Sequence, residues 1–335
     1  MDPINLNESV RIAVMGTGSI GMRHLMLLGQ IPGVRAIAVP KRKERRNDLA
    51  NQGWDTASSI DEAASMGAKL GIIASASGQH LVDGLAGLKS GLDLLIEKPL
   101  ATNSLDAQYL MKRAQETGLK IFVGCVLRFS ESLNNYRDLL PQVGRLHSVR
   151  IECQSYLPNW HPDRCYQASY SARADEGGAL RDLIHEIDYA GWLFGWPASL
   201  QSTVKNLGRL NISSDEAANL NWETLDGYVL SIRLDYLSKP MRRGIIACGE
   251  QGTIQWDGVT QTVNLSLDGQ HTGEYQSEQT TDAMYLAQIH AILDAIRGDV
   301  DPRIANGDDG VKALAVCDTA RLASESRSEE PVTYP

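Results

Sequence analysis

The chain has 335 residues, which is more than one ordinary hydrophobic core holds and suits two domains. Hydrophobic residues make up 43% and charged residues 22%, as in soluble globular proteins. The net charge of -9 argues against a dedicated nucleic-acid binder, because phosphate binding needs a surplus of Lys and Arg. No uninterrupted apolar stretch reaches bilayer-spanning length, so no membrane partner is expected.

The cysteines and the start of the chain both bear on the cellular compartment. Five cysteines are scattered without a C-x-x-C pair, which fits reduced thiols in the cytoplasm better than a disulfide framework. The first residues are polar and lead at once into a strand-like segment. They lack the charged region and apolar region of a signal peptide, so none is expected.

Strand-like and helix-like segments alternate over the first 126 residues. The strand-like segments are residues 10–16, 34–39, 68–75, 92–97 and 120–126. The helix-like segments between them are residues 20–31, 43–52, 80–91 and 104–118. This strict alternation predicts an α/β domain with a doubly wound parallel sheet and right-handed crossovers.

A glycine-rich turn, G-x-G-x-x-G, lies between the first strand and the first helix. Gly16 would allow the tight turn, Gly18 would let the backbone approach a pyrophosphate, and Gly21 would let helix and strand pack closely. The helix start at Ser19 and Ile20 would offer N–H groups to the phosphates. The turn therefore predicts a dinucleotide site. The alternative is a glycine-rich turn without a ligand.

The end of the second strand indicates which dinucleotide is preferred. An Asp or Glu there would hold the ribose 2′-hydroxyl of NAD. This strand ends instead in Pro40, Lys41, Arg42 and Lys43, whose cations suit the 2′-phosphate of NADP. We expect NADP to be preferred, with NAD as the other option. A solvated basic face is the alternative, although basic residues are unfavourable at a helix start.

Five segments together resemble the Gfo/Idh/MocA oxidoreductase family, which includes glucose-fructose oxidoreductase and inositol dehydrogenase, over nearly the whole chain. They are "IIASASGQH", Glu97-Lys98-Pro99, "VGCVLRF", "EGGALRDLIHEIDYAGWLFG" and "NGDDGVKALAVCDTARLASES". Their order and spacing, downstream of the glycine turn, are more specific than any one of them. The resemblance places five further residues beside the cofactor: Ser75, His80, Glu97, Lys98 and Arg128.

The resemblance also implies the domain organisation. A Rossmann domain (residues 1–126) is expected before an α+β substrate-binding domain (127–335) with a large, mostly antiparallel open sheet. Alternating segments fit the strands of that sheet: 144–156, 199–208, 224–236, 242–258 and 261–269. The sheet is expected to join subunits into a homodimer or homotetramer. The final helix, about 309–326, is expected to pack back toward the first domain.

Glu97-Lys98-Pro99 follows the fourth strand, at the sheet edge where ligands of doubly wound folds bind. An ammonium there can exchange a proton with a substrate hydroxyl or carbonyl oxygen beside the nicotinamide. The resemblance therefore implies that Lys98 is catalytic and contacts both cofactor and substrate. Glu97 would orient it, and Pro99 would restrict its backbone. The alternative is an exposed charge without a role.

A second catalytic cluster is expected in "RDLIHEIDY". On a continuous helix, Asp182, His185 and Tyr189 fall along one stripe. A second stripe contains Leu183, Ile187, Ala190 and Phe194. Asp182 and His185 would point into a cleft and bind or protonate the substrate. The family spacing Asp-x-x-x-His puts Arg181 in the acid position, so the role of Asp182 stays open and Arg181 could contact an anionic substrate. A capping or core histidine is the alternative.

Residues 156–178 form a long, aromatic, irregular segment before this helix, as a substrate-covering loop would. Five of its side chains suit a sugar ring and its hydroxyls: Trp160, His161, Arg164, Tyr166 and Tyr170. Trp160 and Tyr166 could equally be loop anchors. Arginines in and near the segment suggest a carboxylate or phosphate on the substrate. His161, Asp163 and Cys165 do not form a compelling metal set, so no metal is expected.

The leading hypothesis is an NAD(P)-dependent dehydrogenase or reductase that acts on a hydroxyl or carbonyl carbon of a sugar, polyol or nucleotide sugar, including an anionic sugar. One alternative is a lyase, isomerase or glycosidase that keeps and recycles a tightly bound nicotinamide. Another is a binding protein that senses NAD(P) without catalysis. These functions would share the same motifs.

Overall fold

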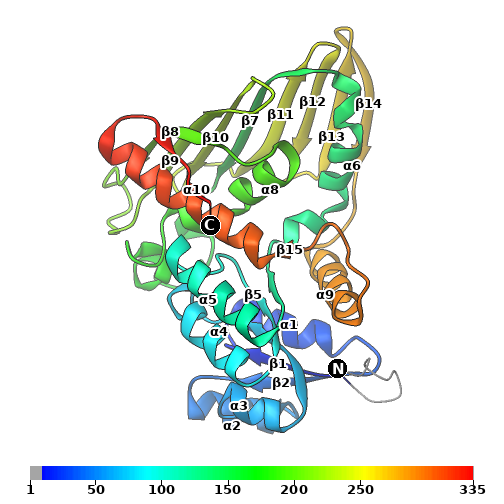
Figure 1. The fold of residues 1–335 in the computed structure, drawn as a ribbon, viewed down its shortest axis with the longest axis vertical. Helices are drawn as coiled ribbons and strands as arrows, with labels where there is room; N and C mark the ends of the chain where they lie inside the picture. The colour runs from blue at the N-terminus through cyan, green and yellow to red at the C-terminus, as the bar shows by residue number, and fades with distance from the viewer. Residues whose placement is uncertain (1–9, 335) are drawn as a thin grey trace. The chain divides into compact units, whose positions relative to one another are not determined.

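The computed structural model describes residues 10–334, which divide into two compact units (Figure 1). The first unit holds the described residues up to Val126 together with Thr280–Val311. The second holds Leu127–Gln279 and the chain from Lys312 onward. Residues 280–311, which the sequence alone assigns to the second domain, thus count with the first. The expectation about a signal peptide concerns residues that lie largely outside the described part.

The first unit is built on a seven-stranded sheet in the order β15-β6-β5-β4-β1-β2-β3. Its strands are β1 (Val10–Met15), β2 (Val34–Val39), β3 (Asp55–Thr56), β4 (Ala68–Ile73), β5 (Asp93–Ile96), β6 (Ile121–Val123) and β15 (Ala305–Asn306). All neighbours pair in parallel except β15, which runs antiparallel to β6. The predicted doubly wound parallel sheet is confirmed.

Helices follow the strands of this sheet (Figure 1). Four of them correspond to the predicted segments: α1 (Ser19–Leu28), α2 (Lys43–Asn51), α4 (His80–Lys89) and α5 (Ser104–Thr117). Two others, α3 (Ile60–Ser65) and α9 (Thr281–Arg297), were not predicted. Local signals set several boundaries. Asn103 caps α5 by accepting a hydrogen bond from the Asp106 amide, and Gly118 ends it in the left-handed conformation.

Helix α9 joins the first unit because its apolar face is part of that unit's core. Tyr285, Ile289 and Ile292 are buried in one cluster with Leu25 and Leu28 of α1. Burying one such side chain stabilises the fold by roughly 1.5–3 kcal/mol. The periodicity of α9 shows an amphipathic helix but does not show which sheet it covers, so its place could not be predicted from the sequence.

The second unit is built on a nine-stranded sheet in the order β14-β13-β12-β11-β7-β10-β9-β8-β16. Its strands are β7 (Leu146–Gln154), β8 (Ser199–Lys205), β9 (Ala217–Glu223), β10 (Val229–Asp235), β11 (Arg242–Gly249), β12 (Gly252–Asp257), β13 (Thr262–Leu267), β14 (Gln270–Gln276) and β16 (Glu330–Pro331). β7 and β10 pair in parallel and the other neighbours are antiparallel. The expected large, mostly antiparallel sheet is confirmed.

One face of this sheet is buried and the other is open. In β9, Ala218, Leu220 and Trp222 are buried while the residues between them are exposed. The helices of this unit are α6 (Glu131–Leu139), α7 (Ala179–Asp182), α8 (His185–Phe194) and α10 (Gly307–Ser326), of which the part from Lys312 counts here. Helices α6, α7 and α8 pack against the sheet. The indole of Trp256 on β12 donates to Ser132 Oγ of α6 at 2.9 Å.

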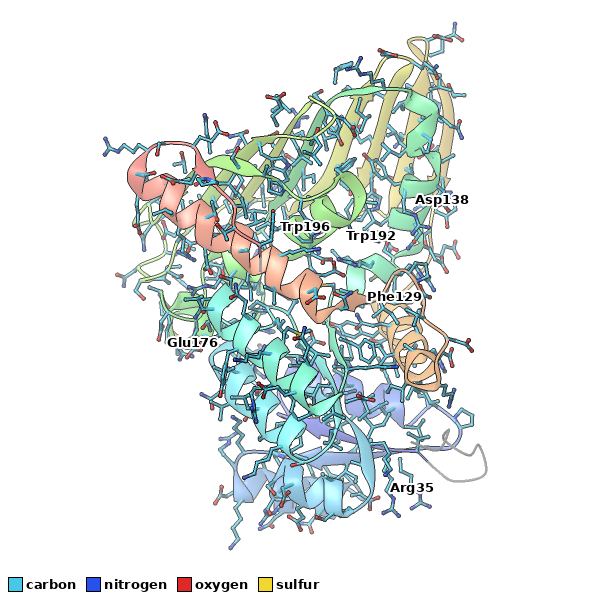
Figure 2. The ribbon with its side chains drawn as sticks, in the orientation of Figure 1. Arg35, Phe129, Asp138, Glu176, Trp192 and Trp196 are labelled. Carbon is cyan, nitrogen blue, oxygen red and sulfur yellow. The ribbon has the colours of Figure 1, made fainter. Side chains whose placement is uncertain are left out.

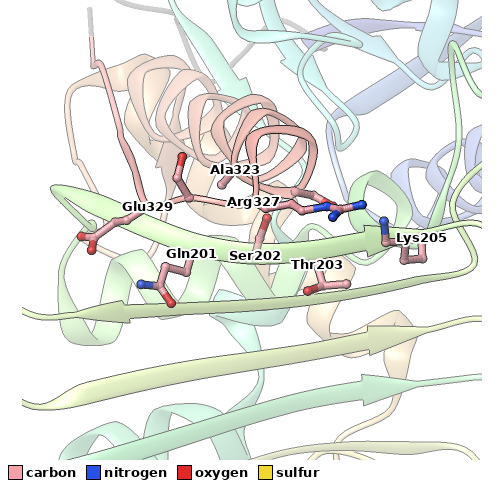
Figure 3. Close-up of a pocket in the computed structure, with 9 residues that line it drawn as sticks. Gln201, Ser202, Thr203, Lys205, Ala323, Arg327 and Glu329 are labelled. Atoms are coloured by element: carbon pink, nitrogen blue, oxygen red, sulfur yellow. The ribbon is translucent and has the colours of Figure 1, made fainter.

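A groove of about 480 Å³ lies between β8 and α10 (Figure 3). Its lining is polar and includes Gln201, Thr203, Lys205, Arg327 and Glu329. None of the residues predicted to bind cofactor or substrate lines it. Among residues 10–334, no helix combines the length and apolar character needed to span a membrane.

Candidate active site

Backbone packing in the glycine turn requires glycine at two positions. Gly16 has φ +88°, and a Cβ on it would lie 2.7 Å from the Ala74 carbonyl oxygen and the Ser75 amide nitrogen. A Cβ on Gly21 would lie 1.9 Å from the Gly16 carbonyl oxygen. The turn is also bonded to the next strand, because the Gly16 amide donates to Val39 O at 3.1 Å. The sequence therefore brings β1, β2 and α1 close together at the carboxyl edge of the sheet.

Gly18 differs from these two glycines because no other group lies within 4 Å of the position its Cβ would take. Gly18 is the N-cap of α1, and no side chain caps that helix end. Ser19 and Ile20 form its first turn. This open space, bordered by the N–H groups of a ten-residue helix, fits the pyrophosphate of a dinucleotide.

The basic residues after β2 have different surroundings. The Lys41 ammonium contacts both oxygens of Asp83 on α4, at 3.0 Å to Oδ1 and 2.9 Å to Oδ2, and donates to Gln79 Oε1 at 3.0 Å. Arg42 is exposed and is the N-cap residue of α2, without a side-chain cap bond. The spacing of the sequence gives no signal that Asp83 pairs with Lys41.

His80 connects the ends of two neighbouring strands. Its side chain is 1% exposed, with Nε2 lying 3.0 Å from the Ser75 oxygen after β4 and Nδ1 lying 2.7 Å from the Pro99 oxygen after β5. Burial lowers the pKa of His80, although the two carbonyl oxygens favour its charged form. His80 therefore fixes the backbone that carries Lys98. Its predicted contact with the cofactor stays a prediction.

Glu97 and Lys98 point to different environments. Glu97 is buried, and its Oε1 lies 2.7 Å from Nε2 of the fully buried His24 on α1. A Cβ on Gly124 would lie 2.8 Å from Glu97 Oε2, so that strand end also packs on the carboxylate. Lys98 is half-buried, and its peptide bond to Pro99 is cis. Glu97 therefore holds the segment to α1, a partnership that the sequence did not reveal.

The expected continuous helix that carries Asp182, His185 and Tyr189 is wrong, because it is interrupted at Leu183. That residue has ψ +32°, and helix α7 ends just before it while α8 begins at His185. The stripe that was to align Asp182 with His185 and Tyr189 therefore does not exist as a single helical face. These three side chains are nevertheless all buried in the second unit.

Asp182 forms a buried hydrogen bond with an aromatic residue. The Tyr236 hydroxyl, at the end of β10, donates to Asp182 Oδ2 at 2.6 Å. Burial and the Asp182 charge raise the pKa of Tyr236 well above its usual value. The Trp160 ring meets the Tyr236 ring edge-on at 5.3 Å, and the Trp160 indole donates to Ser155 Oγ at 2.8 Å. The structure thus brings Trp160 and Asp182 together through Tyr236, which sequence reasoning missed.

Arg181 holds the preceding loop. Its Nη1 donates to the backbone oxygens of Ala174 and Asp175 at 3.1 and 2.8 Å, and the side chain is buried. Burial, with Arg321 nearby, lowers its pKa. Arg181 therefore has a clear structural role, and its predicted contact with an anionic substrate stays a prediction.

The loop 156–178 is partly ordered by its own aromatic residues. The Tyr166 hydroxyl donates to Leu210 O at 3.1 Å, which matches the alternative of a loop anchor. Tyr170 begins a short 3-10 turn, Tyr170–Ala172. Arg164 is exposed. Within the described range 10–334, no group of three or more His, Cys, Asp or Glu residues is placed to bind a metal.

Arg128 belongs to the second unit, where it forms a buried ion pair. Its Nε and Nη2 donate to Asp188 Oδ2 and Oδ1 at 3.0 and 2.7 Å. Its guanidinium also lies 5.6 Å from the centroid of the Trp192 ring. Trp192 is labelled on α8 in Figure 2. This bidentate pair ties the start of the second unit to α8. The predicted role of Arg128 in cofactor binding is untested by this geometry.

Family profiles match both units of the chain. A profile described as an oxidoreductase family with an NAD-binding Rossmann fold matches residues 10–125, and the profile of the GFO/IDH/MocA C-terminal domain matches residues 141–255. Together they span more than half of the chain. The chain belongs to the Gfo/Idh/MocA oxidoreductase family, and the predicted family and enzyme class are confirmed.

Individual relatives agree with this assignment. The rhizopine catabolism protein MocA of Rhizobium meliloti is 26% identical over 92% of this chain and 93% of its own length. A 4-carboxy-2-hydroxymuconate-6-semialdehyde dehydrogenase of Sphingobium sp. is 30% identical, but over 44% of this chain and 48% of that protein. The WlbA dehydrogenase of Bordetella pertussis, solved with NADH and UDP-GlcNAcA, shares the fold with a TM-score of 0.84 at 20% identity, covering 98% and 99% of the two chains.

Proposed function

We propose that this protein transfers hydride between a nicotinamide dinucleotide and a hydroxyl or carbonyl carbon of a sugar, polyol or nucleotide sugar. The observation that carries the proposal is the placement of Lys98 after β5. It stands at the same carboxyl edge of one parallel sheet as the open glycine turn after β1. The WlbA structure with NADH and a nucleotide sugar supports this substrate class, and its acidic ligand supports an anionic sugar.

The residues of the chain would share the proton and binding tasks. When bound, the nicotinamide would accept or supply the hydride. As hydride leaves the alcohol carbon, the hydroxyl proton passes to Lys98 Nζ in its neutral amine form, and the resulting ammonium returns this proton in the reverse direction. Asp182 and His185 would bind substrate oxygens or assist this transfer. Residues of the loop 156–178 would contact the ring.

We further propose that NADP is preferred over NAD. Arg42 supplies an exposed guanidinium three residues after the end of β2, in a segment of residues 40–43 that has no acid to bind the ribose. A charge-assisted contact contributes about 1.5–3 kcal/mol before screening by solvent. The Lys41→Ala/Arg42→Ala double variant should weaken NADP by about tenfold or more and leave NAD nearly unchanged. Equal losses of affinity for NADP and NAD would show that the basic residues 41–43 form only a solvated face.

The protein is proposed to work in the cytoplasm as a homodimer or homotetramer. All five cysteines are free thiols in the structure, as expected for a reducing compartment. The open face of the nine-stranded sheet is the surface proposed to join subunits.

The decisive experiment compares Lys98→Ala with Lys89→Ala, an exposed lysine on α4 of the same unit. Lys89→Ala should bind NAD(P) as the wild type does, and Lys98→Ala should still bind it with a loss much smaller than its loss of turnover, measured by titration calorimetry. Turnover on a panel of anionic and neutral sugars should fall by about a hundredfold or more only in Lys98→Ala, in line with loss of a general acid or base. Full activity in Lys98→Ala would overturn the mechanism. Turnover without net change in NAD(P)H would instead indicate a lyase, isomerase or glycosidase. Binding of NAD(P) by the wild type without turnover of any sugar would indicate a sensor.

A further inference from the structure

The ion pair between Lys41 and Asp83 lies within the region proposed to select the cofactor. Lys41 follows β2, whose last residue bonds to the glycine turn through Gly16 N and Val39 O. Asp83 lies on α4, and its side chain is 6% exposed while that of Lys41 is 40% exposed. A nearly buried carboxylate of α4 therefore holds the partly exposed ammonium of Lys41 close to the end of β2.

This pair changes the charge that a bound nucleotide would meet. Both Asp83 oxygens lie within 3.0 Å of Lys41 Nζ. The carboxylate offsets the positive charge of Lys41, and it also repels a second anion brought close to it. A 2′-phosphate carries such an anion, whereas the 2′-hydroxyl of NAD carries none. The electrostatic effect of Asp83 therefore differs between the two cofactors.

The contacts of Lys41 also allow the effect of the Asp83 charge to be tested separately from the position of the Lys41 ammonium. Gln79 accepts a hydrogen bond from the same ammonium at 3.0 Å, and it is exposed and uncharged. An amide in place of the Asp83 carboxylate would keep the side-chain shape and one acceptor oxygen for Lys41. Such a change removes the negative charge while two acceptors still orient the lysine.

From these contacts we propose that Asp83 is a specificity-determining residue that limits the preference for NADP over NAD. The inference rests on the proposed nicotinamide binding but not on the direction of the wild-type preference. Asp83 acts through Lys41 and through its own charge. Its removal strengthens NADP binding and leaves NAD binding nearly unchanged.

The test measures dissociation constants for NADP and NAD by titration calorimetry on the full chain. Asp83→Asn and Asp83→Ser are the neutral variants, Asp83→Glu keeps the charge, and Gln79→Ala removes an uncharged contact to the same ammonium. Both neutral variants should bind NADP about threefold to tenfold tighter relative to NAD than the wild type does, an effect that salt should diminish. Asp83→Glu and Gln79→Ala should keep the wild-type ratio.

Thermal unfolding identifies any variant that fails to fold. If one of the neutral variants Asp83→Asn and Asp83→Ser does not fold, the affinity ratio of the other one tests the inference. An unchanged or lower NADP/NAD affinity ratio in the folded neutral variants would overturn the inference. A similar shift in Gln79→Ala would also overturn it, because position rather than charge would then matter. If the wild type binds both cofactors equally and Asp83→Asn still shifts toward NADP, the inference stands and the proposed NADP preference fails. If the wild type binds neither, both fail.

Discussion

Gly18 and Gly21 lie three residues apart in one turn, but an added methyl group would meet different surroundings at each. At Gly21 it would lie 1.9 Å from a backbone oxygen, so the backbone must move, which costs about 1–3 kcal/mol or more. At Gly18 it would enter open space. Gly21→Ala should therefore lower the free energy of unfolding, whereas Gly18→Ala should change it by less than about 0.5 kcal/mol.

The two substitutions should also separate in ligand binding. Gly18→Ala fills the space assigned to the pyrophosphate, so we expect the dissociation constant for NAD(P) to rise about tenfold or more in a protein of normal stability. Urea unfolding and cofactor titration on the two variants provide the measurements. Wild-type affinity in Gly18→Ala would show that the open space is not a phosphate site.

His80 should make stability depend on pH. Its pKa is lowered by burial from an ordinary value of 6.5, so the unfolded chain binds a proton more readily than the folded one. The stability contributed by neutral His80 is complete above about pH 6.5 and is lost as pH falls below it, by at most ~1.4 kcal/mol per unit. Between pH 7.5 and 5.5, the wild type should thus lose more stability than His80→Gln.

The matched control for this experiment is His290→Gln, because His290 is exposed on α9 of the same unit. Urea unfolding of the first unit at both pH values gives the free energies to compare. The control should keep the wild-type pH dependence. The same pH dependence in His80→Gln would show that this histidine does not titrate differently on folding.

Single residues also show where sequence reasoning reached its limit. The glycines were predictable because their role follows from a short pattern between a strand and a helix. The Tyr236–Asp182 and Lys41–Asp83 contacts were not, because each joins residues from different elements and no local spacing encodes the pairing. His24 is likewise the partner of Glu97 across 73 positions of the chain.

Element by element, the alternation of strands and helices over the first 126 residues was predicted, whereas several elements elsewhere and the shortest strands were missed. The five long strands of the first sheet were predicted, whereas β3 and β15 have two residues each and cannot show a period. β14, an exposed strand without apolar alternation, was also missed. The seven-residue strand β9, whose residues do alternate, and the helices α6 and α9 were not predicted either. The break between α7 and α8 was missed because tertiary bonds of Arg181 and Asp182 fix the chain on its first side.

Helix α9 gives a direct test of the unit to which it belongs. Ile289 is 1% exposed in the core of the first unit, so Ile289→Ala should destabilise that unit by about 2–5 kcal/mol. Met26→Ala on α1 is the control, since its side chain is 55% exposed and should cost little. Unfolding monitored by loss of NAD(P) binding reports the first unit. An equal and small effect of both changes would show that α9 is not part of that core.

The two units hold the candidate residues on different sheets. The first holds the open glycine turn and Lys98 at a parallel sheet, and the second holds Asp182 and His185 beside a large sheet with an open face. The acidic net charge is an average over the chain and does not describe local charge, since Lys41, Arg42 and Lys43 follow β2 closely. Composition therefore predicts broad classes of partner, whereas a candidate site depends on the position of single residues.

The open face of the second sheet leads to a prediction about assembly. In β11, Ile245 and Ala247 are fully buried, so Ile246 between them lies on the opposite, open face at the centre of the sheet and is only partly exposed. If this face joins two copies, a charge at its centre would be desolvated on association, which is costly without a partner. Ile246→Glu should therefore dissociate the oligomer, as measured by size-exclusion chromatography with light scattering.

The control for this prediction is Val259→Glu, on the exposed turn between β12 and β13, which should leave the mass of the oligomer unchanged. A monomeric wild type, or an Ile246→Glu variant with the wild-type mass, would show that subunits do not meet through the centre of this face.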